Sequence, residues 1–122
     1  MGAYIQNSNY LHFVQNIIKD NELGITSNSD NNINITSNLL NGNVLAGVTF
    51  VITRDSTVFQ NNIDGSQNGI FADAQSSGNK VAMNNILHNV IDINNANGIS
   101  AQDNNNHFSD NNCQVSNPRL LC

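Results

Sequence analysis

Apolar residues recur along this chain in a pattern with a period of about 23 residues. The pattern is clearest at Val58–Ile63 and Val81–Ile86, which carry the same apolar-x-x-Asn-Asn-Ile phrase one period apart. The last apolar residues of successive phrases are Ile18, Leu40, Ile63, Ile86 and Cys113, at intervals of 22, 23, 23 and 27. Such a period is too long for a helix heptad and matches one coil of a stacked solenoid.

Three further columns keep register with these reference positions. An apolar residue stands five positions earlier in each repeat: Phe13, Ile35, Val58, Val81 and Phe108. Asparagine stands two positions earlier: Asn16, Asn38, Asn61, Asn84 and Asn111. A glycine followed by a small or β-branched residue comes about sixteen positions earlier: Gly2-Ala3, Gly24-Ile25, Gly47-Val48, Gly69-Ile70 and Gly98-Ile99. The columns predict an all-β solenoid of about five coils, each of about 22–23 residues.

Each repeat is expected to contain short strands joined by turns. Alternation after the glycine points one residue inward and the next outward. Asn-Gly pairs at 41–42, 68–69 and 97–98 predict turns between strands. Asn-Gly is also typical of antiparallel hairpins, so a meander is the rival fold, but a meander does not require this period. The long last interval predicts a bulged loop between Leu87 and Asn97 on the outside of the stack.

A single coil cannot bury its own inward side chains, so the coils must stack about 4.8 Å apart. Equivalent residues of successive coils then lie directly above one another. The Asn column can form an internal ladder, because an amide offers both a donor and an acceptor along the stack. Asparagine also tolerates the left-handed backbone of a tight bend.

The Gly-Ile pairs and the Asn-Asn-Ile phrases at 61–63 and 84–86 resemble the right-handed parallel β-helix family, the pectate-lyase-like superfold. The resemblance covers residues 2 to about 116, which predicts repeats over 1–116 and a C-terminal tail over 117–122. Right-handed winding follows from this resemblance and from the usual hand of parallel connections. The family includes lyases, hydrolases, epimerases, phage tailspikes and adhesins, so the resemblance implies a fold and leaves the activity open.

The composition limits the kinds of partner that this chain can bind. The net charge of −5, with only four Lys and Arg residues, argues against a nucleic-acid or anionic-membrane surface. A disordered polar tract is the alternative for so Asn-rich a chain, but 39% of the residues are apolar and they are regularly spaced. At most one disulfide is possible: Cys113 falls on a core position, and Cys122 is expected to be mobile. The start lacks the features of a secretory signal, and an extracellular or surface location is nevertheless favoured.

The resemblance implies that a ligand would lie along the outer face of one sheet. The first outward column is Tyr4, Thr26, Thr49, Phe71 and Ser100. The second is Gln6, Asn28, Val51, Asp73 and Gln102. This mixture of aromatic, hydroxyl and amide groups suits sugar rings and their hydroxyls, and an ordinary solvated β-face is the alternative. Ice is a further possible ligand, because Thr26 and Thr49 begin a threonine column that Phe71 interrupts.

Catalytic chemistry has little support in the sequence. Asp73 has no acid in its column, and Asp30 and Asp103 would lie three coils apart, which exceeds the separation of a working carboxylate pair. His88 and Asp92 are either a base with its orienting acid or a loop pair without chemistry. No metal-ligand spacing appears, and no cofactor is expected.

The sequence therefore predicts a non-catalytic β-helix module, structural or carbohydrate-contacting, with a polysaccharide as the possible partner. A fragment of a polysaccharide-acting lyase, hydrolase or epimerase is the alternative, and an ice-binding solenoid is the third. The first coil would present open strand edges, so we expect a second copy or further coils to cover that end.

Overall fold

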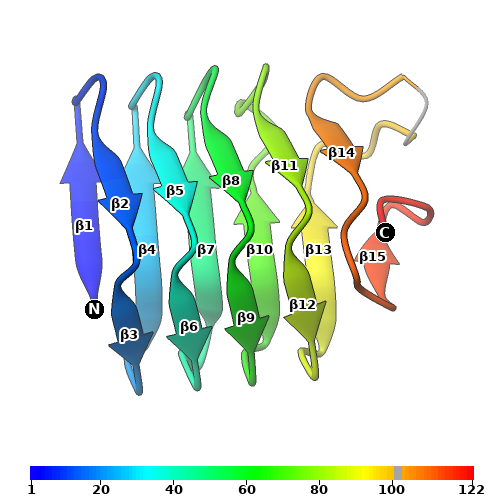
Figure 1. Ribbon diagram of the computed structural model, residues 1–122. Coiled ribbons are helices and arrows are strands. Elements are labelled where there is room, and N and C mark those ends of the chain that lie inside the picture. The colour runs from blue at the N-terminus through cyan, green and yellow to red at the C-terminus, as the bar shows by residue number, and fades with distance from the viewer. Residues whose placement is uncertain (101–102) are drawn as a thin grey trace.

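The structure is a computed structural model that describes residues 1–100 and 103–122. Every regular element in these residues is a β-strand, and they contain no helix long and apolar enough to cross a membrane. The strands form three sheets that wind around one axis (Figure 1).

The first sheet has six strands: β1 (Ala3–Gln6), β4 (Leu23–Asn28), β7 (Ala46–Val51), β10 (Asn68–Ala72), β13 (Ile91–Asn95) and β15 (Ser116–Asn117). The second sheet has five: β2 (His12–Val14), β5 (Asn34–Thr36), β8 (Thr57–Phe59), β11 (Lys80–Ala82) and β14 (His107–Ser109). The third has four: β3 (Ile17–Lys19), β6 (Leu39–Asn41), β9 (Asn62–Asp64) and β12 (Asn85–Leu87).

Every strand pairs in parallel with its copy one coil away, so the predicted right-handed parallel β-helix is confirmed and the antiparallel meander is wrong. In Figure 1 the first sheet rises at the back, the other two descend at the front, and the chain advances from left to right, which is right-handed winding. Strict stacking follows from the hydrophobic columns, because a slip of one residue would turn each inward side chain toward solvent.

The core consists of columns of buried aliphatic side chains inside the coil. One column in the first sheet is Ile25, Val48, Ile70 and Ile93, each at most 1% exposed. The next inward column places the ring of Phe50 between the small side chains of Ser27 and Ala72. Alternating large and small side chains in this way lets neighbouring coils pack closely.

The Asn ladder runs through the bend between the second and third sheets. The amide Nδ2 of each ladder Asn donates to the Oδ1 of the next, at 3.0 Å for all four pairs from Asn16 to Asn111. The left-handed residue of each bend is not the ladder Asn but the residue before it: Gln15, Ser37, Gln60, Met83 and Asp110. The ladder therefore holds a bend whose backbone these non-glycine residues would otherwise disfavour.

The other two corners contain similar polar columns that were not predicted. One comprises Asn21, Asn43, Ser66 and Asn89, and the other comprises Ser56, Asn79 and Asn106. The Oδ1 atoms of Asn43, Asn79, Asn89 and Asn106 each accept the main-chain N–H of the column residue one coil before, whereas the Ser66 hydroxyl has no partner among the described residues. Their recurrence once per coil was a usable signal.

The glycine column exists because of a close approach between coils. A Cβ on Gly47 would lie 2.5 Å from Cγ2 of Ile63 and 2.8 Å from the carbonyl oxygen of Gly69. Asn68-Gly69 was expected to form a turn, but it lies inside β10. Glycine is therefore required in this column because it has no side chain. Its absence lets the first sheet pack closely against the third.

The fifth coil differs from the prediction. Ile93 pairs with Ile70 and Asn94 with Phe71, so the fifth strand of the first sheet is Ile91–Asn95 and does not begin at Gly98-Ile99. The chain is longer from Ile93 to Phe108 than from Ile70 to Val81, so the four extra residues follow β13 and do not lie between Leu87 and Asn97. Asp92 takes the glycine position, and its carboxylate accepts the main-chain N–H groups of the next coil at Gln114 and Val115.

The C-terminal tail folds back over the last coil. Leu121 is 2% exposed and belongs to the core cluster. Cys122, which was expected to be mobile, forms a disulfide with Cys113. The tail therefore covers this end of the hydrophobic bore and is held there covalently.

Candidate functional site

The first outward column of the first sheet lies largely where the sequence predicted it. The parallel register places Tyr4 beside Thr26, Thr26 beside Thr49, and Thr49 beside Phe71. The fifth position was wrong: Asn94 occupies it, because the fifth strand begins earlier. Ser100 instead lies in the loop after β13, where its hydroxyl donates to Asp103.

The second outward column is partly engaged within the protein. Gln6, Asn28 and Val51 pair in register across β1, β4 and β7. Asp73 follows β10, and its carboxylate accepts hydrogen bonds from the N–H groups of Ile52, Gln75 and Ser76 and from the Ser76 hydroxyl. These bonds position a turn. The fifth predicted member, Gln102, lies outside the described residues.

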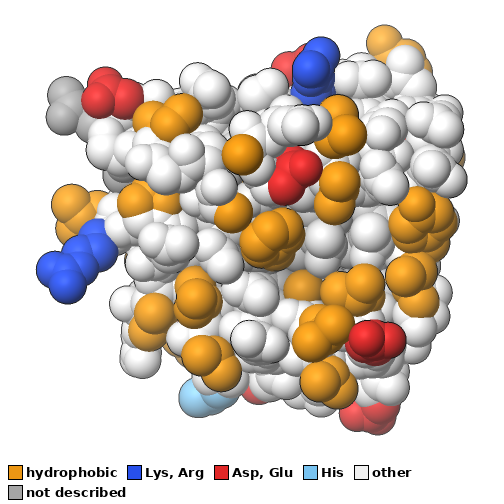
Figure 2. Space-filling view, turned by 180° about the vertical axis from the view of Figure 1, so that it is seen from behind, with side chains coloured by type: hydrophobic (Ala, Val, Ile, Leu, Met, Phe, Trp, Pro, Cys, Tyr) orange, Lys and Arg blue, Asp and Glu red, His pale blue; other side chains and the backbone are white. Residues whose placement is uncertain are grey.

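A groove of about 280 Å³ opens on this face. Its lining residues are Leu23, Leu45, Ala46, Thr49, Gln67, Asn68 and Phe71. They come from three consecutive coils, and the strands β4, β7 and β10 hold them in fixed register. Figure 2 shows this side of the molecule, with hydrophobic side chains gathered over its lower half and the Lys and Arg side chains at its margins.

Two threonine hydroxyls on this face lack a partner. Thr26 is 6% exposed and Thr49 is 9% exposed, and neither Oγ1 has a hydrogen-bond partner among the described residues. A buried hydroxyl without a partner costs about 1–3 kcal/mol. Of these two residues, only Thr49 lines the groove. The burial also means that these hydroxyls form no exposed threonine row of the kind expected for ice binding.

Hydrogen-bonded amide groups extend along this face beyond the groove. The Asn94 Nδ2 donates to Asn68 Oδ1 at 3.0 Å, and the Asn117 Nδ2 donates to Asn94 Oδ1 at 3.1 Å. On β1 and β4, the Asn28 Nδ2 donates to the Tyr4 hydroxyl at 3.1 Å. The face thus presents two aromatic rings, separated by two threonines and bordered by oriented amides.

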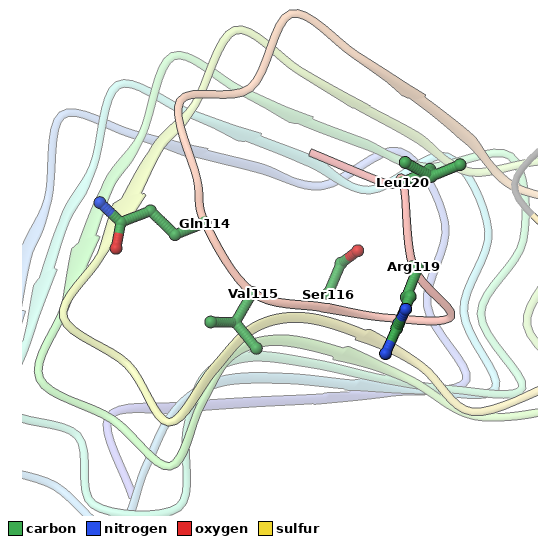
Figure 3. A pocket seen from close by; sticks show the side chains of 5 residues that line it. All are labelled: Gln114, Val115, Ser116, Arg119 and Leu120. Atoms are coloured by element: carbon green, nitrogen blue, oxygen red, sulfur yellow. The ribbon is translucent and has the colours of Figure 1, made fainter.

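A second hollow of about 340 Å³ lies at the C-terminal end. Its lining residues are Gln114, Val115, Ser116, Arg119 and Leu120. Figure 3 shows Gln114 and Leu120 pointing away from each other on opposite sides of the tail. The hydroxyl of Ser116 is already used, because it donates to the carbonyl of Pro118 and accepts from the N–H of Leu121. The side chains do not converge on a ligand position.

The acids and histidines do not assemble into a catalytic or metal-binding group. Asp30 is buried and accepts the Ser8 N–H, the Ser27 hydroxyl and the Asn28 N–H. The pairing of His88 with Asp92 was wrong: Asp92 points to the last coil, and Nδ1 of His88 lies 3.6 Å from Oδ2 of Asp64. In the part of the chain that the structure describes, no three His, Cys, Asp or Glu residues gather at a point.

A family model described as "NosD: Periplasmic copper-binding protein (NosD)" matches residues 1–118. The chain belongs to the NosD family. NosD models describe right-handed parallel β-helices, in agreement with the observed fold. No curated protein and no solved structure matched the chain.

The predicted outward columns begin after each glycine and therefore omit part of the groove. The residues just before the glycine also form a column, in which Leu23, Ala46 and Asn68 pair in register. Their spacing of one coil from each to the next carried this signal. What the spacing could not show is that these residues and Phe71 enclose a common groove.

Proposed function

We propose that this NosD-family chain is a non-catalytic β-helix module that binds carbohydrate in the groove of the first sheet. The observation that carries the proposal is Thr49, which lines the groove with Phe71 and two amide side chains and whose hydroxyl has no hydrogen-bond partner in the part of the chain that the structure describes. Apolar walls with a few placed polar groups are typical of sites for small ligands.

The chemistry of the lining matches a sugar ring. Phe71 offers an aromatic face against which the C–H side of a pyranose can pack. Gln67 and Asn68 each carry a donor and an acceptor, as each sugar hydroxyl does. The Oγ1 of Thr49 is shielded in the free protein, and rotation about χ1 exchanges it with the methyl group. A ligand that accepts or donates there recovers the cost of the missing hydrogen bond.

The proposal that the module is non-catalytic rests on the side chains that line the groove. Its seven lining residues include no carboxylate, histidine, cysteine, lysine or arginine. Glycoside cleavage needs a proton donor and a base or nucleophile on opposite sides of the bond. The carboxylate of Asp73, two residues after Phe71, already accepts three hydrogen bonds from its own turn and one from the Ile52 N–H of the preceding coil. Binding without turnover is the activity that this groove supports.

Copper, which the family description names, does not fit the side chains of this chain. Copper sites use His, Cys and Met ligands. Here the two cysteines are joined in a disulfide, and His12 and His107 lie on the first and last strands of the second sheet. His88 has Asp64 beside it, and the described residues place no third His, Cys, Asp or Glu there. The proposed function therefore involves no copper.

The disulfide agrees with an oxidising compartment, such as the periplasm that the family description names. We accordingly include a location outside the cytosol in the proposal.

A glycan array followed by calorimetric titration of the best ligand tests the proposal. We expect Phe71→Ala to weaken binding about tenfold. Thr49→Val should weaken binding about three- to tenfold while leaving folding stability equal or slightly higher, because it removes a hydroxyl without a partner. That opposite response of affinity and stability separates a binding role from a structural one.

Phe59→Ala is the matched control. Phe59 is a half-buried phenylalanine on β8, outside the groove, and its neighbours in register are Thr36 and Ala82. Its replacement should leave binding unchanged. Equal losses for Phe71→Ala and Phe59→Ala, or no binding to any glycan, would refute the proposed site. Release of reducing or unsaturated sugar that Asp73→Asn abolishes would refute the non-catalytic assignment.

A further inference from the structure

The groove face lacks basic side chains. The chain has four, namely Lys19 in β3, Arg54 between β7 and β8, Lys80 in β11 and Arg119 after β15. None of them lines the groove. Figure 2 shows Lys and Arg side chains only at the borders of this face. A carboxylated or sulfated sugar would find no cation to pair with here.

The charges close to the groove are negative. Glu22 is exposed and directly precedes Leu23, which lines the groove. Asp73 lies two residues after Phe71, which lines it from the other side. The chain as a whole carries a net charge of −5. An anionic ligand would therefore lose hydration on entering the groove and would also meet like charges.

We infer that the ligand of this groove is a neutral glycan, and that acidic polysaccharides such as polyuronates are excluded. This inference rests on the proposed function, because it specifies the ligand of the same groove. An uncharged ring with an apolar face can use Phe71 and the amides without leaving a charge unpaired. Burial of an unpaired charge costs far more than the other contacts in such a site supply.

A matched pair of polymers tests the inference. The full chain is titrated with methyl-esterified polygalacturonan and with the same polymer after removal of the esters, at about 20 mM and about 500 mM salt. We expect the esterified polymer to bind at least about fivefold more tightly at low salt. The difference should shrink at high salt, because the Debye length falls from about 20 Å to about 4 Å. A panel of neutral glucans, galactans and mannans accompanies the pair.

The outcomes are distinguishable. Binding of the neutral polymers with rejection of the acidic one supports the inference. Equal or tighter binding of the de-esterified polymer, lost in Phe71→Ala, overturns the inference while the proposed function stands. Absence of binding to the pair and to the whole panel overturns the proposed function, and the inference with it.

A charge reversal beside the groove provides a second test. Glu22→Lys should strengthen binding of the de-esterified polymer about three- to tenfold at low salt and have little effect at high salt. Asp110→Lys changes the net charge equally, but its site follows β14, on a different sheet. An equal gain in both variants would show that net charge alone controls binding, which would overturn exclusion by the groove.

Discussion

The internal Asn ladder can be tested at its centre with Asn61→Ala. Asn61 is 1% exposed. Its Oδ1 accepts the main-chain N–H of Asn38 at 2.8 Å and the Asn38 Nδ2 at 3.0 Å. Its Nδ2 donates to the carbonyl of Ile35 at 2.8 Å and to Asn84 Oδ1 at 3.0 Å. The Nδ2 also donates to the carbonyl of Phe59 at 3.2 Å. Alanine removes all five contacts and provides no replacement.

The cost follows from what remains unpaired. The Asn38 Nδ2 keeps its bond to the Phe13 carbonyl, and Asn84 Oδ1 keeps the N–H of residue 61. The main-chain N–H of Asn38, a residue that is 2% exposed, loses its acceptor. One orphaned buried N–H costs about 1–3 kcal/mol, and each lost amide bond adds about 0.5–1.5 kcal/mol. We therefore expect a loss of about 3 kcal/mol in the free energy of unfolding.

Urea denaturation measures this loss. With a slope of about 1–3 kcal/mol per molar, the midpoint should fall by about 1–3 M. Amide hydrogen exchange gives a local check, because the Asn38 N–H should lose protection before the rest of β5 and β6. Asn62→Ala is the control: Asn62 is the next residue, is exposed, and accepts one bond from Asn85. It should cost less than about 0.5 kcal/mol. Equal losses in the two variants would refute a stabilising ladder.

Three further predictions concern the cap, the glycine column and copper. Cys122→Ser should lower the free energy of unfolding by about 2.5 kcal/mol, which is the loop-closure value for its sequence separation of 9 from Cys113. A thiol reductant should lower the stability of the wild type by the same amount and leave the variant unchanged. Gly47→Ala should cost about 3 kcal/mol through the clash with Ile63, measured by the thermal midpoint. Gly98→Ala is the control and should cost about 1 kcal/mol, because its added Cβ meets no atom and only its left-handed backbone is disfavoured. Equal losses in the two glycine variants would contradict the close approach between coils at Gly47. Copper(II) at equimolar concentration should neither remain bound after dialysis nor raise the thermal midpoint, and retention of one copper per chain would contradict the ligand argument.

The repeat pattern was sufficient to predict the coil, its inward columns and the Asn ladder. The reason is that parallel in-register stacking gives each coil nearly the same environment, so a local requirement recurs at a fixed interval. Asn38, Asn61 and Asn84 show this most directly: one Asn per period is what an amide chain needs. The outward positions Thr26, Thr49 and Phe71 followed from the same alternation.

The fifth coil and the cap were decided by tertiary structure. Gly98-Ile99 fits the sequence pattern, but Asp92-Ile93 pairs with β10 and bonds to the final coil through the Asp92 carboxylate. The position of the fifth strand thus follows the hydrogen bonds between coils and not the Gly-Ile sequence motif. Likewise, no spacing indicated that the tail would return Cys122 to Cys113.

The groove also depends on the folded state. Its residues lie in three coils, from Leu23 to Phe71, and each looks like an ordinary surface position within its own repeat. Only the stacked arrangement shows that Thr49 is enclosed and that its hydroxyl lacks a partner among the described residues. A periodic sequence specifies which face a side chain occupies, whereas the shape of that face depends on how unlike neighbours from different coils pack together.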